Sequence, residues 1–247
     1  MTMKRLIEGG RHIGLTLSPL QIAAFQCYSD QLLEWNRRIN LTAVIDPEQV
    51  EIRHFLDSLS CLSALCSVSS EPLAAWLSRS LQALDIGSGA GFPGVPLKIV
   101  WPSLRLALLE SRQKKVRFLE HIVADLGLSS VCALSGRAET LAHNLKHREA
   151  YDLVFGRAVA ELPVLLEYAL PFCRRGGLVL AQKGEAAAAE AIASERALAV
   201  LGGTLRRIVP VEIPGLAETR RIMVVEKIAQ TPDRYPRRPG MPGKRPL

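Results

Sequence analysis

Residues 84–94 read Leu84-Asp85-Ile86-Gly87-Ser88-Gly89-Ala90-Gly91-Phe92-Pro93-Gly94. They follow a short apolar run and precede a stretch with helical periodicity. Glycines in this position let the backbone turn tightly and approach a ligand closely. Open α/β sheets bind their ligands at the carboxyl ends of the strands. The stretch therefore predicts a strand, a cofactor-binding loop and a helix, with Phe92 and Pro93 as walls of the pocket.

Apolar runs and helical stretches alternate on both sides of this loop. Strands are predicted over 81–86, 104–109, 131–134, 151–155 and 177–181, and helices over 112–126, 161–173 and 185–201. This alternation indicates an α/β fold with a mostly parallel sheet and helices on both faces. Two more strands, over 204–210 and 221–227, are joined without a helical pattern, so we expect an antiparallel hairpin at one edge of a seven-stranded sheet.

The chain divides into three parts. Residues 1–80 are predicted to form a helical extension packed on the core, 81–230 the cofactor-binding domain and 231–247 a tail. Ser18-Pro19 is a typical helix start, followed by an apolar face of Phe25, Tyr28, Leu32 and Trp35. A second helix is expected from Asp46, with an apolar stripe of Val50, Phe55, Leu59 and Leu62. The tail holds too much proline and glycine for a regular element, which favours a flexible or surface-laid segment.

Composition narrows the functional classes. Apolar residues make up 48% of the 247 residues and charged residues 22%, a balance typical of a globular chain. We find no signal peptide and no apolar run long enough to span a bilayer, so a cytosolic protein without membrane contact is expected. Five irregularly spaced cysteines indicate free thiols. The tail supplies +4 of the net charge of +7, which favours a polyanionic partner such as RNA, although basic tails also serve solubility alone.

Two cofactor classes fit the glycine loop. From Gly89 the sequence matches the dinucleotide fingerprint, so a nicotinamide cofactor is one candidate. Glu110 ends the second strand, where an acidic side chain binds ribose hydroxyls in either class. Asp85 favours S-adenosylmethionine, because it can anchor the loop and reach the charged amino end of a methionine moiety. The loop glycines Gly87, Gly89 and Gly91 complete this expected cofactor site.

The loops after the third and fourth strands should reach the same crevice. Gly136-Arg137-Ala138-Glu139 is expected beside the adenine end of the cofactor, where Glu139 could read the base edge. Arg157 should face the crevice from the substrate side.

With these segments in view, the chain resembles the bacterial small-subunit rRNA guanine-N7 methyltransferases, the RsmG or GidB family. The resemblance rests on the glycine loop and on these further segments: Trp35-Asn36-Arg37-Arg38-Ile39-Asn40-Leu41-Thr42, Arg53-His54-Phe55-Leu56-Asp57-Ser58-Leu59, Gly136-Arg137-Ala138-Glu139, Arg157-Ala158-Val159-Ala160, Lys183-Gly184 and the Tyr-Pro-Arg-Arg-Pro-Gly tail. It implies a class I, Rossmann-like methyltransferase fold, S-adenosylmethionine as donor and a guanosine in the 530 loop of 16S rRNA as acceptor. Gly87, Phe92, Ala138, Glu139 and Arg157 are the implied cofactor positions. Phe155-Gly156 departs from the small polar pair expected there, which could reshape the pocket wall.

The implied reaction requires no general base, so no catalytic residue is assigned. Guanine N7 carries an in-plane lone pair and can attack a methyl group without losing a proton, which leaves positioning and desolvation as the sources of catalysis. His54 and Asp57 could form a proton-handling pair or half of a metal site, but no further ligand has the right spacing. We therefore favour a contact between the N-terminal helices and the sheet, and expect no metal.

The expected RNA contacts are basic residues in three segments: Arg37, Arg38, Lys183, Arg234, Arg237, Arg238, Lys244 and Arg245. The expected partner is 16S rRNA within the small subunit or an assembly intermediate, bound by a monomer. Two alternatives stay open at this point: a non-catalytic RNA-binding protein on the same fold, and a nicotinamide-dependent oxidoreductase.

Overall fold

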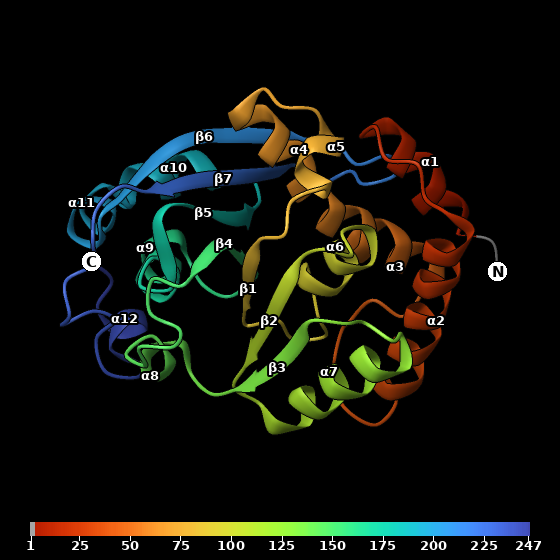
Figure 1. Cartoon of the computed structure of the whole chain (residues 1–247), viewed down its shortest axis with the longest axis horizontal. Coiled ribbons are helices and arrows are strands. Elements are labelled where there is room, and N and C mark those ends of the chain that lie inside the picture. The colour runs from red at the N-terminus through yellow and green to blue at the C-terminus, as the bar shows by residue number, and fades with distance from the viewer. Residues whose placement is uncertain (1–2) are drawn as a thin grey trace.

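A seven-stranded sheet forms the centre of the computed structural model, which describes residues 3–247 (Figure 1). Its strands are β1 Gln82–Ile86, β2 Arg105–Glu110, β3 Val131–Ser135, β4 Tyr151–Arg157, β5 Cys173–Lys183, β6 Gly203–Val211 and β7 Arg220–Lys227. The order across the sheet is β3-β2-β1-β4-β5-β7-β6. Only β7 runs antiparallel to its neighbours, β5 and β6. The predicted parallel sheet and its closing hairpin are therefore confirmed.

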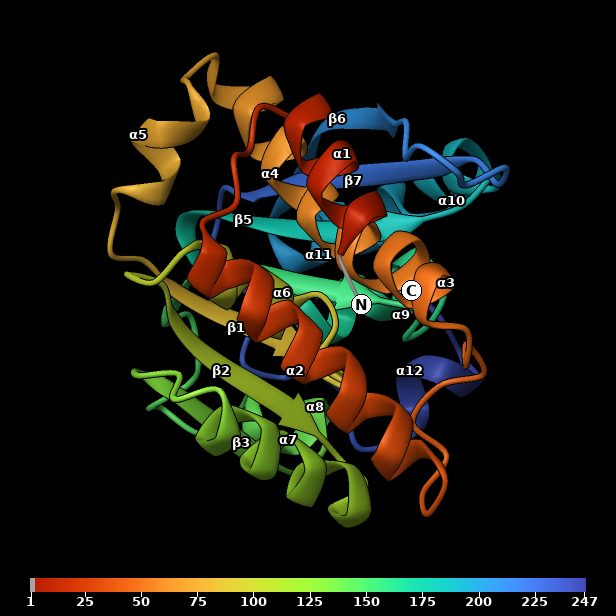
Figure 2. The same ribbon diagram turned by 90° about the vertical axis from the view of Figure 1, so that its right-hand side faces the viewer.

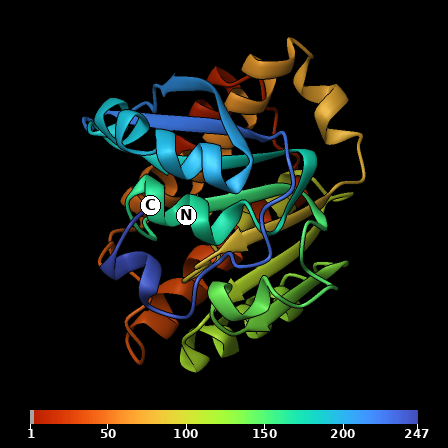
Figure 3. The same ribbon diagram turned by 90° about the vertical axis from the view of Figure 1, so that its left-hand side faces the viewer.

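Helices cover both faces of this sheet (Figures 1 and 3). One face carries α1 Lys4–His12, α2 Pro19–Asn36, α3 Pro47–Val50, the π-helix η1 Glu51–Leu56, α4 Asp57–Ser69, α5 Leu73–Leu77, α6 Gly94–Val100 and α7 Gln113–Asp125. The other carries α8 Ala138–Leu141, α9 Leu162–Ala169, α10 Ala187–Ala193, α11 Glu195–Leu201 and α12 Met241–Lys244. The helix expected over 185–201 is divided at Ser194, whose hydroxyl donates to the Glu190 carbonyl 2.6 Å away. None of the helices within residues 3–247 is long and apolar enough to cross a membrane.

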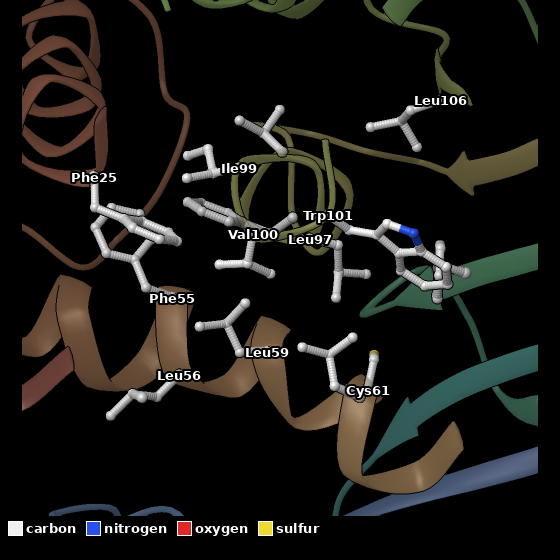
Figure 4. Packing of buried hydrophobic residues seen from close by; sticks show 14 of the residues in the cluster. Phe25, Phe55, Leu56, Leu59, Cys61, Leu97, Ile99, Val100, Trp101 and Leu106 are labelled. Atoms are coloured by element: carbon white, nitrogen blue, oxygen red, sulfur yellow. The ribbon is translucent and has the colours of Figure 1, made fainter. Parts of the chain in front are cut away.

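The N-terminal helices share one apolar core with the sheet. Ser18 caps α2 by accepting from the Gln21 amide, and the Gln21 side chain accepts from the Ser18 amide in return. Phe25 of α2 packs on Phe55 with 5.0 Å between ring centroids. Figure 4 shows this aromatic pair beside the apolar residues of α4 and α6. Tyr28 of α2 stacks on Phe92 of the glycine loop with 5.4 Å between ring centroids, so α2 lies against this loop.

The expected second helix begins at Pro47 but contains a π-helical segment. Asp46 caps it by accepting from the Gln49 amide at 2.9 Å. The apolar stripe steps five residues from Val50 to Phe55, a spacing that the wider π turn places on one buried face. π turns are frequent at functional sites, and this one carries His54 to the carboxyl end of the sheet.

The tail is laid on the surface of α8 and α9, and it holds one short helix. The prediction that it contains no regular element is wrong over Met241–Lys244, because Pro242 lies in the first helical turn, where no amide donor is needed. Side chains from the body of the protein bind the tail backbone. Arg148 donates to the carbonyls of Thr231 and Tyr235, and Arg237 pairs with Glu167 at 2.6 Å.

Candidate functional site

The site lies where the strand order reverses. β2 and β3 extend to one side of β1, while β4 and β5 extend to the other, so the carboxyl ends of β1 and β4 flank a crevice. One hollow, here the β1–β3 cleft, is lined by Ile86, Gly87, Leu109, Ser111, Gly136, Arg137, Ala138, Glu139, Val159 and Tyr168. A second, here the β4–β5 pocket, is lined by Asp57, Arg157, Ala158, Gln182, Lys183, Gly184 and Arg220.

The glycine loop has a backbone that other residues would strain. Gly87, Gly89 and Gly91 have φ values of +64°, +61° and +98°. A Cβ on Gly91 would lie 2.7 Å from the Tyr28 hydroxyl oxygen and 2.7 Å from Val95 Cγ2. Tyr28 in turn donates to the Ala90 carbonyl. The loop is therefore held against α2.

Replacing Gly91 with alanine is expected to destabilise the fold by about 3 kcal/mol, because the positive φ and the close contacts both oppose a side chain. Gly127 is the matched control, since its φ is +60° and no atom lies within 4 Å of the place that a Cβ would take. Gly127→Ala should cost about 1 kcal/mol, the backbone contribution alone. Urea unfolding of both variants measures the difference, and equal losses would contradict the packing argument.

Two carboxylates hold the glycine loop by accepting hydrogen bonds from its backbone amides. Asp85 is fully buried and accepts from the Gly94 amide at 2.9 Å, at the start of α6. Glu110 accepts from the amides of Gly89 and Arg112 at 3.1 and 2.8 Å. Both side chains thus have the loop-anchoring position expected for Asp85, and Glu110 stands at the end of β2 next to the cleft residue Ser111.

Burial raises the pKa of Asp85 from 3.8 to about 7. The folded state then retains a proton that the unfolded chain has released, so the free energy of unfolding falls as the pH rises from about 4 to 7. An asparagine in its place would accept the same Gly94 bond without ionising. The free energy of unfolding of Asp85→Asn, relative to that of the wild type, should therefore rise by roughly 4 kcal/mol between pH 4 and pH 8. Urea unfolding across this range checks it, with Asp233→Asn, an exposed carboxylate, as control. Parallel pH profiles for Asp85→Asn and wild type would disprove it.

The start of α8 lines the β1–β3 cleft, and the tail contacts one of its lining residues. Ala138 and Glu139 both line the cleft. Glu139 Oε1 also accepts from the Gly240 amide at 2.9 Å.

Arg157 organises the β4–β5 pocket. Its Nη2 donates to His54 Nδ1 at 2.7 Å, and its Nη1 lies 3.0 Å from Asp57 Oδ2. Its guanidinium carbon is 5.3 Å from the centroid of the Phe92 ring, on which the His54 ring also stacks at 4.5 Å. Arg157 therefore joins the glycine loop to the N-terminal helices, and it lines the β4–β5 pocket rather than the cleft.

His54 is neutral and has both ring nitrogens engaged. Burial, followed by the neighbouring Arg157 charge, lowers the pKa of His54 to about 3. Because Arg157 can only donate, Nδ1 accepts and the proton is assigned to Nε2, which donates to Thr42 Oγ1 at 2.7 Å. His54 thus positions Arg157 and has no free lone pair with which to take a proton.

Asp57 stands between two arginines. It is 4% exposed, its Oδ1 lies 3.4 Å from Arg220 Nε, and burial raises its pKa although Arg157 and Arg220 oppose the shift. The sequence interpretation of His54 and Asp57 as a contact between helix and sheet matches these partners on β4 and β7. The position of His54 and Asp57 at this pocket was not predicted from the sequence. A signal for it exists, because Arg157 is two residues after Phe155 on β4 and so lies on the same face of the sheet, which the N-terminal helices cover. In the described part of the chain, no three His, Cys, Asp or Glu side chains come together as metal ligands.

Phe155 and Gly156 do not shape the pocket wall. Phe155 is fully buried in the core, and a Cβ on Gly156 would lie 2.7 Å from Leu165 Cδ1 of α9. The expectation that this pair could reshape the pocket is wrong, because one side chain points into the core and the other position abuts a helix.

The expected RNA contacts lie at the end of α2, in the β4–β5 pocket and in the tail. The end of α2, with the exposed Arg37 and Arg38, and the tail both lie at the edge of the sheet where the parallel strands end (Figure 2). Arg38 borders a hollow with Lys114 and Lys115. Lys183 lines the β4–β5 pocket but pairs with Glu190 at 2.7 Å. In the tail the exposed cations are Arg234, Arg238, Lys244 and Arg245, whereas Arg237 is held by Glu167.

Comparison with known proteins identifies the family of this chain. A model of the GidB family, rRNA small subunit methyltransferase G, matches residues 21–222. The chain is 46% identical over 245 residues to the ribosomal RNA small subunit methyltransferase G of Roseiflexus castenholzii, covering 99% of this chain and 100% of that relative. The chain belongs to the rRNA small subunit methyltransferase G family. The protein of the same name from Pelotomaculum thermopropionicum is 44% identical over 240 residues, covering 97% of this chain and 96% of its own length.

Family membership confirms the resemblance and makes the chain a methyltransferase with S-adenosylmethionine as donor. It removes the nicotinamide and non-catalytic alternatives. Among solved structures, MtNAS in complex with MTA and tNA has a TM-score of 0.55 at 15% identity, covering 84% of this chain and 71% of its own. TrmN from Thermus thermophilus has a TM-score of 0.50 at 20% identity, covering 72% and 53%. At these identities the likeness concerns the fold alone.

Proposed function

We propose that the protein transfers a methyl group to N7 of a guanine in the 530 loop of 16S rRNA. The observation that carries the choice of N7 is the state of the titratable groups in the β4–β5 pocket. Asp57 is paired with arginines and Lys183 with Glu190, so neither is poised to remove a proton. An acceptor atom with its own in-plane lone pair needs no such base, and guanine N7 is one.

The β1–β3 cleft fits the donor. Ile86, Leu109 and Val159 offer apolar walls to a flat purine, while Glu139 and Ser111 offer polar groups at its edge. Gly87, Gly89, Gly91 and Phe92 would hold the methionine and ribose portions, with Asp85 and Glu110 bracing the loop beneath them. When bound, S-adenosylmethionine supplies an electrophilic methyl group whose bond to sulfur breaks as the N7 lone pair forms the new bond. The chain's own residues then contribute orientation and exclusion of water.

We place the reaction in the cytosol, on the small subunit or an assembly intermediate, with a monomer as the active form. The basic residues at the end of α2 and in the tail, both at the edge of the sheet where the parallel strands end, support a polyanionic partner.

The test is transfer of labelled methyl to small subunits and rRNA from cells that lack this gene, followed by nucleoside analysis. The expected product is 7-methylguanosine, lost in a Gly87→Val variant because a Cβ there would lie 3.0 Å from Val159 Cγ2. Label in another nucleoside would contradict the proposed acceptor atom. No label on any RNA form, despite measured cofactor binding, would contradict rRNA as the substrate.

A further inference from the structure

Three buried polar atoms at the β4–β5 pocket lack hydrogen-bond partners within residues 3–247. They are Asp57 Oδ1, Gln182 Oε1 and Arg157 Nη1. Buried polar groups are normally satisfied, and an unsatisfied one destabilises the fold, so three at one pocket call for an explanation. All three residues line this pocket, and Asp57 and Gln182 are only 4% and 7% exposed.

The neighbouring contacts hold these atoms in place without satisfying them. Gln182 Nε2 donates to the Asp57 backbone carbonyl at 2.6 Å, which fixes the amide and leaves its oxygen unused. Arg157 is fixed by His54 through Nη2, and Nη1 makes only an ion pair with Asp57 Oδ2. Arg220 lies 3.4 Å from Asp57 Oδ1 in an ion pair without hydrogen-bond geometry. Gln182 and Arg157 are thus held in place, and the pocket offers two acceptors and one donor.

We propose that Asp57, Gln182 and Arg157 read the Watson–Crick edge of the acceptor base and select guanine. This inference rests on the proposed function and names the residues that give it base specificity. Guanine presents two donor groups, N1–H and the 2-amino group, and one acceptor, O6, which complement the three free atoms. Adenine presents one donor group and one acceptor, and cytosine and uracil each present one donor group and two acceptors, so none of them matches.

The assignment also suits the chemistry at N7. A base held by its Watson–Crick edge keeps N7 free, because N7 lies on the Hoogsteen edge. Methylation of N7 makes the ring cationic and its N1–H more acidic. We assign N1–H to the Asp57 carboxylate, since that hydrogen bond strengthens as the charge develops. The 2-amino group would donate to the Gln182 side-chain oxygen, and O6 would accept from Arg157 Nη1. Arg220, with its side chain 28% exposed, lies 3.4 Å from Asp57 Oδ1 in the free protein. The base would displace it, since the N1 and 2-amino groups of guanine resemble a guanidinium, while Arg157 keeps Asp57 Oδ2 in an ion pair.

The experiment compares methyl transfer to 16S rRNA that carries guanosine or inosine at the methylated position. Inosine lacks only the 2-amino group and keeps N1–H, O6 and N7. For the wild type, kcat/KM should fall about 10-fold with inosine, because the Gln182 oxygen stays unpaired. For Gln182→Met, the rate on guanosine RNA should fall about 10-fold and the guanosine to inosine ratio should shrink below about 3. Gln82→Met, an exposed site at the start of β1, is the control and should keep the wild-type ratio.

Two results would overturn the assignment: a wild type that does not distinguish the two bases, or a Gln182→Met variant that slows both substrates by the same factor. The latter would make Gln182 a structural residue only. If the urea unfolding curve shows that Gln182→Met does not fold, Gln182→Asn is tested in its place. This variant shortens the side chain by one methylene and so withdraws the amide from the base. The same loss of discrimination between guanosine and inosine is expected. Failure of the proposed function has a different signature, since the wild type would then leave guanosine RNA unlabelled.

Discussion

Replacing Arg157 with alanine is expected to lower kcat/KM for methyl transfer about 100-fold, because one side chain fixes three parts of the site. Without it, His54 loses the donor to Nδ1, Phe92 loses the guanidinium at its ring face, and Asp57 retains only Arg220 at 3.4 Å. Arg157→Lys should recover little of the rate, since an ammonium group cannot serve His54 and Asp57 together as the planar fork does. Initial rates over a range of rRNA concentrations measure the effect.

The control for Arg157 is Arg175→Ala, which removes the same charge from an exposed site near the start of β5, at the opposite end of the sheet. It should keep the wild-type rate within about twofold. Urea unfolding of each variant separates loss of activity from loss of fold. An Arg157→Ala variant that is folded and within threefold of the wild type would show that Arg157 does not organise the site.

Arg237→Ala is expected to destabilise the protein by about 3 kcal/mol, although Arg237 lies in the tail. Glu167 in α9 is fully buried, and its two oxygens accept from Nε and Nη2 of Arg237 at 2.9 and 2.6 Å. Removing the arginine leaves an uncompensated buried carboxylate. Urea unfolding checks the loss, with the neighbouring exposed Arg238→Ala as a control that should stay within about 0.5 kcal/mol of the wild type. A loss below 1 kcal/mol for Arg237→Ala would mean that the tail is not anchored by this pair.

The local sequence signals were sufficient for the sheet and the cofactor loop. Each strand is a short apolar run next to a helical period, and the glycine loop follows β1 with Glu110 at the end of β2. These features are set within a few residues of the chain, so periodicity and turn chemistry capture them. The fold class and the parallel sheet with its antiparallel hairpin were predicted on that basis.

The β4–β5 pocket depended on contacts between residues far apart in the chain. Asp57 meets Arg157 and Arg220 only after the N-terminal helices pack on the sheet, and the π turn adjusts which side chains face it. No local sequence pattern predicts contacts between residues so far apart in the chain. The tail had one usable signal, since Glu167 is a charged residue in the otherwise apolar α9 and requires a cation if it is buried. Its partner, Arg237, was instead predicted to contact RNA.

The most direct test of the account is a single-turnover comparison of 16S rRNA carrying guanosine or 7-deazaguanosine at the methylated position. The analogue keeps the Watson–Crick edge and replaces N7 with a carbon that has no lone pair. We expect the analogue RNA to compete for the enzyme as well as guanosine RNA does and to accept no methyl label, while guanosine RNA is converted to 7-methylguanosine. Label on the 7-deazaguanosine RNA would contradict the account, because the methyl group would then have reached an atom other than N7.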